Sequence, residues 1–285
     1  MTDALFGETV LDQAGSDKAL TPTLDRSNVA VVIPALNEAM RIRDVVESAL
    51  GECDCVIVID DGSDDGTADK IADLPVTLLR HAQRMGKGAT LRDGFREALR
   101  QGAAAVLTMD GDGQHHADDI PRLLDAANRH PNRIVIGARL RKRSQQPTYR
   151  RIANDFGDWG IAWGCGFRIT DSQSGHRVYP AAVVALQDVP GEDFVYEAQL
   201  LISAARRLNI GAVSVPIESR YATADTPQQF RKSHFRPLHD LYRITAHVVV
   251  QVWTYGHVIR EYRRARSIPA MIDDPSGEFS SRAKR

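Results

Sequence analysis

Along the chain, short apolar runs that predict strands alternate with stretches in which apolar residues recur at helical spacing. Residues 29–34 (VAVVIP) form a nearly unbroken apolar run, and Ile42, Val45, Val46 and Ala49 then recur at helical spacing. Short β-branched runs are typical of strands that are buried on both faces of a parallel sheet. The repeated alternation predicts an α/β fold with a mostly parallel sheet and helices on both faces. Further strands are expected within 55–63, 76–81, 105–108, 133–139 and 213–221, and further helices near 66–74, from about 88, and near 119–129, 148–163 and 193–208.

The chain divides into three expected parts. With 285 residues, 43% of them hydrophobic, it is long enough to bury the core of one large domain. We expect that domain at 27–237, a flexible extension at 1–26, and an amphipathic helix with a basic tail at 238–285. The first part lacks the basic and apolar regions of a signal peptide, and no apolar run reaches the roughly 20 residues of a spanning helix. The sequence therefore predicts a protein that does not cross a bilayer.

Net charge and cysteine content limit the kinds of partner and the cellular compartment that we expect. The formal net charge is -1, so overall charge does not favour nucleic acid, and we expect no nucleic-acid partner. The three cysteines are too few and too poorly spaced for a disulfide framework or a four-ligand zinc site. A reducing, cytoplasmic environment is the prediction.

Polar side chains follow four of the expected strands, at the edge where a parallel sheet binds ligands. A simple Asp-Gly turn is one interpretation of 109–114 (MDGDGQ) taken by itself. Three acidic turns on one edge repel one another, however, unless a cation or a donor-rich ligand lies among them. We therefore expect a site that contains Pro34, Asn37 and Glu38 after the first strand, Asp60, Asp61 and Ser63 after the second, Asp110, Asp112 and Gln114 after the fourth, and Arg139 after the fifth.

Eight motifs resemble, in order, those of family 2 glycosyltransferases. They are VVIPALNE, VIDDGSDDGT, GKGATLRDGF, MDGDGQH, VIGAR, DSQSGHRVY, VPIESRY and SHFRP, and they span about residues 29–245. One D-x-D motif is a weak signal, whereas the ordered set is specific. The chain most resembles the dolichyl-phosphate mannose synthase branch and its bacterial polyprenyl-phosphate relatives. This implies a Rossmann-like GT-A fold, a GDP- or UDP-linked hexose as donor, a divalent metal, and inversion at the anomeric carbon.

The resemblance implies a metal site at the fourth strand exit. The departing diphosphate gains negative charge as the glycosidic bond breaks, and Mg²⁺ or Mn²⁺ held by a few hard oxygen ligands neutralises it. Asp110, Asp112 and the amide oxygen of Gln114 match that need, with Asp112 required for turnover. Lys87 precedes a helix N-terminus that suits phosphate, and a solvated lysine in a tight turn is the alternative.

The first two strand exits resemble the family's nucleotide site. Asp60 and Asp61 match a pair that accepts hydrogen bonds from the base and the ribose, and Pro34, Asn37 and Glu38 match its nucleotide-contacting start. Two structural alternatives stay open. Asp61 is equally suited to a helix cap or an Asx turn, and Glu38 to the first turn of the following helix.

Two hypotheses about the reaction differ in the chemical group that accepts the sugar. A polyprenyl phosphate is already an anion and attacks without a general base, but cations must draw it into an acidic site. Arg139, Arg150 and Arg220 fall where phosphate-acceptor members of the family carry arginines, although Asn154 replaces a serine that is frequent there. A hydroxyl acceptor needs a carboxylate base, and Asp193 stands where hydroxyl-acceptor members often carry theirs, unless it only begins a helix.

Two segments suit a membrane surface. The stretch 238–267 is amphipathic, contains Trp253 and Tyr255, and ends in a cluster of arginines, as in a helix that lies on a bilayer. Docking on the sheet or on a second subunit explains it equally well. Residues 139–151 carry six cations and no acid, which suits either anionic headgroups or a solvated loop. We expect a polyprenyl phosphate or other lipid acceptor at the inner membrane face, reached by peripheral contact or through a membrane partner protein. A homodimer is the other expected assembly.

Two other protein classes share parts of this pattern. A sugar nucleotidyltransferase, like a dinucleotide- or ATP-binding enzyme, carries a glycine-rich loop directly after the first strand, and residues 31–43 (VVIPALNEAMRIR) lack it. A non-catalytic protein on the same scaffold would have lost its metal ligands, yet Asp110 and Asp112 are both present. The enzyme interpretation is therefore favoured.

Overall fold

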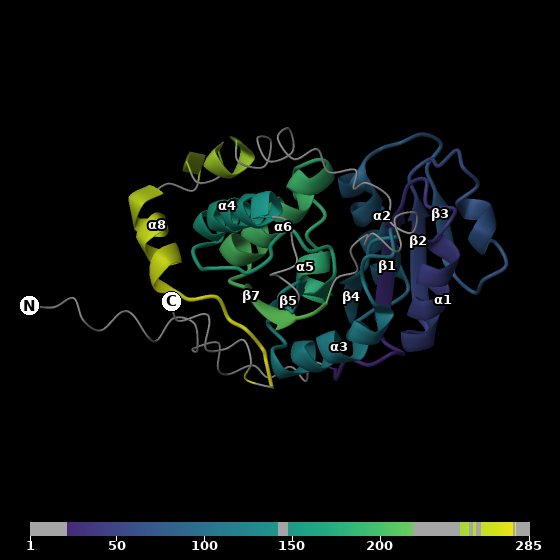
Figure 1. The fold of residues 1–285 in the computed structure, drawn as a ribbon, viewed down its shortest axis with the longest axis horizontal. Helices are drawn as coiled ribbons and strands as arrows, with labels where there is room; N and C mark the ends of the chain where they lie inside the picture. Colours follow the sequence, from purple (N-terminus) through teal and green to yellow (C-terminus); the bar gives the residue numbers. More distant parts are fainter. Residues whose placement is uncertain are drawn as a thin grey trace, which may run out of the picture.

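A computed structural model describes residues 22–141, 148–218, 246–250, 253–254, 258–275 and 277. Its strands are β1 (Val29–Ala35), β2 (Cys55–Asp60), β3 (Thr77–Arg80), β4 (Ala105–Thr108), β5 (Arg133–Ala138), β6 (Arg177–Pro180) and β7 (Gly211–Pro216). They form one sheet in the order β3-β2-β1-β4-β6-β5-β7 (Figure 1). All neighbouring strands are parallel except β6, which is antiparallel to both β4 and β5. The mostly parallel sheet that the sequence predicts is confirmed.

Helices cover both faces of the sheet. They are α1 (Ile42–Glu52), α2 (Lys87–Arg100), α3 (Ile120–Arg129), α4 (Thr148–Cys165), α5 (Ala181–Val184), α6 (Asp193–Arg207) and α8 (Val258–Ser267), with the 3₁₀ helices η1 (Ala68–Ile71) and η2 (Ala117–Asp119). Along β1, Ala30 and Val32 join one hydrophobic cluster and Val29, Val31 and Ile33 the other, because successive strand side chains point to opposite faces. Residues of α2, α4, α5 and α6 complete the first cluster, and residues of α1 and α3 the second.

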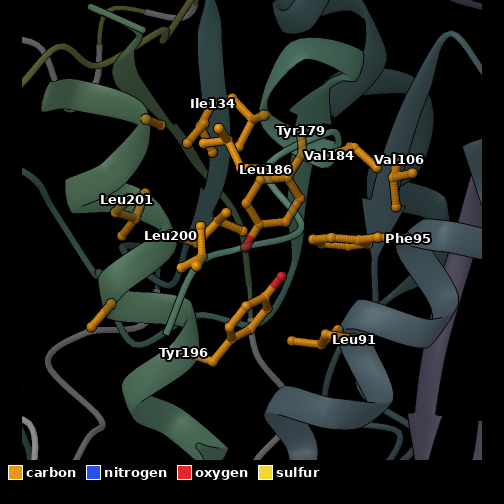
Figure 2. Close-up of a cluster of buried hydrophobic side chains, with 14 of the residues drawn as sticks. Leu91, Phe95, Val106, Ile134, Tyr179, Val184, Leu186, Tyr196, Leu200 and Leu201 are labelled. Atoms are coloured by element: carbon orange, nitrogen blue, oxygen red, sulfur yellow. The ribbon is translucent and has the colours of Figure 1, made fainter. Parts of the chain in front are cut away.

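The core between the sheet, α2 and α6 combines aliphatic side chains with the rings of Phe95, Tyr179 and Tyr196 (Figure 2). Phe95 of α2 meets Tyr179 of β6 edge-on, with ring centroids 5.3 Å apart. Tyr196 of α6 lies next to them, and its hydroxyl points toward that of Tyr179 (Figure 2). A Cβ at Gly88 would lie only 3.0 Å from the Tyr196 Cβ. The first turns of α2 and α6 are thereby held side by side.

The sequence pattern does not predict β6 or α5. Strand β6 has only four residues and begins with Arg177, a charged residue that is nevertheless fully buried. Its guanidinium donates to the carbonyls of Ser172 and Ser174, at 2.7 Å each, so the charge is satisfied inside the core. Strand β7 ends at Pro216, before the end of the expected strand 213–221, of which 219–221 lie outside the described residues.

The two ends of the described chain contact the domain. The backbone of Leu24 makes two hydrogen bonds with the side chain of Asn128, so the domain begins before the expected boundary at 27. Residues 1–21 lie outside the described part.

Helix α8 packs on α4, where Trp163 Nε1 donates to the Val258 carbonyl at 3.0 Å. Docking on the domain therefore accounts for the buried face of α8. No helix in the described part of the chain is long and apolar enough to cross a membrane.

Candidate active site

The acidic strand exits lie next to one another, as predicted. Strand β1 lies between β2 and β4, so the three carboxyl ends share one edge of the sheet. Asp60 pairs in register with Ala35 at the ends of β2 and β1. A Cβ at Gly111 would lie 3.2 Å from the Pro34 carbonyl oxygen, so the loop after β4 passes directly over the end of β1.

Glycines shape the loop that carries Asp110 and Asp112. A Cβ at Gly175, two residues before β6, would collide with the Asp110 carboxylate, so a larger residue there would have to displace that carboxylate. Gly113 has a φ of +74°, a conformation that other residues rarely adopt. The backbone N–H of Gln114 donates to Asp112 Oδ1 at 3.0 Å. The Gln114 amide as a metal ligand stays a prediction.

A lysine connects this loop to α6. Lys87 is the first residue of α2, and its Nζ lies 2.8 Å from Asp110 Oδ1 and 3.1 Å from Glu197 Oε2. Its ammonium therefore pairs with carboxylates, and a contact to the donor phosphates stays a prediction. The sequence analysis missed Glu197, which is 6% exposed. The available signal was a single acid within the apolar helical stretch 194–202 (FVYEAQLLI).

The two aspartates of the loop have pKa values shifted in opposite directions. Burial by itself raises the pKa of Asp110, but Lys87 and His115 outweigh it, and the pKa lies well below its ordinary value. Burial, followed by the charge of Asp110, raises the pKa of Asp112. A positive charge beyond that of Lys87 would therefore stabilise the ionised pair.

These residues fit a divalent metal that takes further ligands from a diphosphate. Within the described ranges, no group of three or more His, Cys, Asp or Glu side chains is placed to hold a metal ion. Asp110 and Asp112 supply two hard carboxylates, and Mg²⁺-like ions bind through one or two carboxylates together with substrate phosphates. The chain by itself offers only part of a coordination shell.

Asp60 is fully buried at the end of β2. Its Oδ1 accepts the Ser63 N–H at 2.9 Å, and its Oδ2 lies 3.2 Å from Arg80 Nε. Asp60 thus makes a local turn of the kind that the sequence offered as the alternative for Asp61. Its role toward the nucleotide stays a prediction.

Asp61 fixes the loop that leads into α2. Its carboxylate accepts the backbone N–H groups of Met85 and Gly86 at 2.8 and 2.9 Å, and it lies 2.7 Å from His81 Nδ1. The loop in turn presents Lys87 to Asp110. This positioning role was not predicted, and recognition of base or ribose by Asp61 remains a prediction.

The exit of β1 is tied to the exit of β2. Asn37 has a left-handed φ of +55°, its N–H donates to Ser63 Oγ at 2.9 Å, and its Oδ1 accepts the Asp64 N–H at 3.0 Å. Glu38 is buried and lies 3.2 Å from the Arg41 guanidinium. Helix α1 begins four residues after Glu38, so Glu38 precedes the first turn.

Arg139 follows β5 and is paired with Asp171. Its Nε and Nη2 donate to the two carboxylate oxygens at 2.8 and 2.5 Å. Asp158 of α4 holds the same loop by accepting the Asp171 N–H at 2.8 Å. A role for Arg139 toward an acceptor phosphate stays a prediction. The side chain of Arg150, in the first turn of α4, and the whole of Arg220 lie outside the described residues.

Asp193 begins α6 close to the loop that precedes α2. Its φ is +48°, a left-handed conformation that is uncommon outside glycine and is concentrated at functional sites. A Cβ at Gly86 would lie 2.5 Å from Asp193 Oδ1, and one at Gly88 would lie 3.2 Å from the Asp193 nitrogen. Asp193 therefore lies beside the Lys87 segment, and its role as a general base stays a prediction.

Comparison with known proteins identifies the family. The model of "Glycosyl transferase family 2" matches residues 30–180, which is more than half of the chain. The chain belongs to glycosyl transferase family 2. This glycosyltransferase is also 29% identical, over 205 residues, to the uncharacterized protein MJ1222 of Methanocaldococcus jannaschii, with 70% of this chain and 84% of that protein covered.

Solved structures support the fold of this glycosyltransferase. Glucosyl-3-phosphoglycerate synthase from Mycobacterium tuberculosis, in complex with phosphoglyceric acid, matches with a TM-score of 0.58 and 23% identity over 79% of both chains. The same enzyme with Mn²⁺, UDP-glucose and phosphoglyceric acid matches with a TM-score of 0.58 and 21% identity over 80% of this chain and 79% of that one. The predicted GT-A architecture is confirmed.

Gly86 offers a test of the packing between the loop and Asp193. We expect Gly86→Ala to lower the free energy of unfolding by about 2–3 kcal/mol. The backbone of Gly86, at φ 90° and ψ 157°, lies in a region essentially restricted to glycine, and the new Cβ would also meet the Asp193 carboxylate. Gly102→Ala is the matched control, since Gly102 has a φ of +81° with nothing within 4 Å of its Cβ, and it should cost only about 1–2 kcal/mol. Urea unfolding measures both. Equal losses of stability in the two variants would show that the Asp193 side chain moves aside at no cost.

His81 makes the stability of this loop depend on pH. Burial lowers its pKa, but hydrogen bonds to Asp61 and Asp93 outweigh burial, and the net pKa lies above the ordinary value of 6.5. The stabilisation by imidazolium is therefore complete below about pH 6.5 and is lost as the pH rises through the folded-state pKa. Relative to His81→Asn, the wild type should gain more stability at pH 6 than at pH 9 in urea unfolding. A stability difference between wild type and His81→Asn that is the same at pH 6 and pH 9 would contradict this role of His81.

Proposed function

We propose that this enzyme moves a hexose, with inversion, from a UDP-linked sugar to a polyprenyl phosphate in a reaction that depends on Mn²⁺. The observation that carries the proposal is the partly buried cluster of charged side chains at the end of β4. There, Asp110 and Asp112 lie with Lys87 and Glu197 at the edge of the sheet where α/β proteins bind ligands. Such a cluster suits a diphosphate and its metal.

The donor and the metal are supported by the fold comparison. Glucosyl-3-phosphoglycerate synthase from Mycobacterium tuberculosis has been solved with Mn²⁺ and UDP-glucose, and this chain shares its architecture. A likeness of 21% identity supports UDP over GDP and Mn²⁺ over Mg²⁺ as the first choices to test.

The residues of the chain have distinct tasks in this reaction. A bound divalent cation supplies positive charge to the departing diphosphate. Asp110 and Asp112 hold that cation through their carboxylates. The first turns of α2 and α6 lie side by side, and their N–H groups favour negative charge at the same place. Asp60, Asp61, Pro34, Asn37 and Glu38 are assigned to the nucleoside.

A lipid-linked acceptor at the inner membrane face is supported by an exposed surface on α4 and α8, which lie side by side (Figure 1). Phe156 and Trp159 of α4, Trp253, and Ile259 of α8 are between 43% and 70% exposed. Helix α8 (VIREYRRARS) carries four arginines and one glutamate. Apolar and aromatic side chains beside arginines suit an anionic bilayer. Arg139, Arg150 and Arg220 are assigned to the acceptor phosphate, as in the dolichyl-phosphate mannose synthase branch.

A second candidate is transfer to a hydroxyl group. The observation that favours it is the left-handed Asp193 at the start of α6, beside the segment that carries Lys87. A carboxylate near the proposed donor site supports Asp193 as the general base for a neutral acceptor. The structural neighbour was solved with phosphoglyceric acid, so a small phosphorylated acceptor with a free hydroxyl belongs in the test.

The test combines three sugar nucleotides with three acceptors in separate reactions of the same enzyme. Purified protein with Mn²⁺ is incubated with radiolabelled UDP-glucose, UDP-N-acetylglucosamine or GDP-mannose, each with polyprenyl phosphate, polyprenol or 3-phosphoglycerate. Label on polyprenyl phosphate that survives in Asp193→Asn supports the first proposal. Label only on a hydroxyl acceptor, abolished in Asp193→Asn, replaces it with the second. The anomeric configuration of the product, measured by NMR, decides between inversion and retention.

A further inference from the structure

Lys87 and a divalent metal would compete for the same carboxylate. Lys87 Nζ lies 2.8 Å from Asp110 Oδ1, where a metal held by Asp110 would also have to approach. The two side chains are only 18% and 28% exposed, so water screens the repulsion between an ammonium and a dication poorly. In the protein without ligands, Lys87 already neutralises Asp110. A metal binds there only if the ammonium moves.

Glu197 gives the ammonium a second partner. Its Oε2 lies 3.1 Å from the same Nζ, and its side chain is 8% exposed. Lysine carries its charge on a flexible stem, so Lys87 can transfer its ion pair to Glu197 without leaving the site. The Glu197 backbone is held meanwhile, because its carbonyl accepts a hydrogen bond from Arg177.

The carboxylates of the cluster outnumber its ammonium group. Asp110, Asp112 and Glu197 bring three carboxylates around the one ammonium of Lys87, in a partly buried site that the Arg177 guanidinium also borders near Glu197. A dication would offset the excess of carboxylates. The metal would then pair with the two aspartates and Lys87 with Glu197. A single lysine shared between two acids is the arrangement expected before that exchange.

We propose that Lys87 and Glu197 form an internal cation switch, in which Lys87 blocks the metal site of the free enzyme and shifts to Glu197 when metal and nucleotide bind together. The inference rests on the proposed function, because it takes the metal to bind Asp110 and Asp112. It predicts weak metal binding to the free protein and tight binding with a nucleoside diphosphate, whose phosphates also attract the lysine. By linkage, metal and nucleotide raise each other's affinity by the same factor.

The test measures Mn²⁺ binding directly, by electron paramagnetic resonance of free Mn²⁺ and by calorimetry, without nucleotide and with UDP. Without nucleotide, Lys87→Met should bind Mn²⁺ at least tenfold more tightly than the wild type, because the competing cation is gone. Glu197→Gln should bind it several-fold more weakly, because the displaced lysine has lost its partner. The gain in Mn²⁺ affinity on adding UDP should shrink in Lys87→Met.

Two controls separate the switch from general electrostatics and from misfolding. Arg96→Met removes one positive charge from the same helix at an exposed position paired with Asp93, and it should change Mn²⁺ affinity less than twofold. Lys87→Arg keeps the charge and should keep Mn²⁺ binding weak without nucleotide. Thermal unfolding of each variant reports its fold, and Glu197→Gln tests the switch even if Lys87→Met does not fold.

The outcomes distinguish this inference from the proposed function. Wild-type protein that binds Mn²⁺ with UDP, together with Lys87→Met and Glu197→Gln that bind it as the wild type does, would overturn the switch and leave the metal site standing. Wild-type protein that binds no Mn²⁺ even with saturating UDP would overturn both. Tight Mn²⁺ binding by the wild type without nucleotide would also overturn the switch.

Discussion

Asp110→Asn and Asp112→Asn should each reduce glycosyl transfer about a thousandfold, at saturating donor and Mn²⁺. Each change removes a negative oxygen ligand from the place where the diphosphate must be neutralised, while the amide keeps nearly the same size. The rate is measured by release of nucleoside diphosphate from the sugar nucleotide. This is the largest effect on activity that we expect from a single substitution.

The two changes should differ in their effect on stability. Burial by itself raises the pKa of Asp110, but Lys87 and His115 outweigh it and lower that pKa, so Asp110→Asn should unfold more readily than the wild type in urea. The raised pKa of Asp112 shows that its charge is unfavourable in the protein without ligands, so Asp112→Asn should unfold no more readily than the wild type in urea. Asp118→Asn is the matched control, because Asp118 is an exposed acid shortly after the same loop and should leave the rate unchanged. Near-normal turnover by Asp112→Asn would refute the metal assignment.

Arg177→Met should lower the free energy of unfolding by about 3–5 kcal/mol. The guanidinium is fully buried and donates to the carbonyls of Ser172 and Ser174 and to the hydroxyl of Tyr179. Methionine fills a similar volume but leaves these acceptors unpaired in the core. Urea unfolding followed by circular dichroism measures the loss, and no single substitution should cost more stability.

A comparison with lysine tests the reason for this loss. Arg177→Lys keeps the charge but cannot reproduce the fork of donors, so it should recover only part of the lost stability. Arg96→Met, at an exposed position, should change stability by less than about 0.5 kcal/mol. A loss at Arg177→Met no greater than at Arg96→Met would show that the buried guanidinium does not hold the loop before β6.

The fold was accessible from the sequence because hydrophobic periodicity is a local property. Each expected helix and parallel strand rests on spacing within about 15 residues. The register of β1 with β2 and β4 is given by the tertiary structure alone. Strand β6 was not accessible in this way. Its four residues carry no period, and its place between β4 and β5 comes from antiparallel pairing with two strands that lie far from it in the sequence.

The sequence by itself determined the α/β fold, the family, and the edge of the sheet where Asp110 and Asp112 meet the exits of β1 and β2. It could do so because hydrophobic periodicity and motif order can be read along the chain, and because ligands bind at the carboxyl ends of parallel strands. Only the tertiary structure decided that Lys87 pairs with Asp110 and Glu197, that Asp61 holds the loop before α2, and that Asp193 lies beside Gly86. Lys87 and Glu197 are 110 residues apart, and their 3.1 Å ion pair exists because packing between α2 and α6 brings two helix starts together.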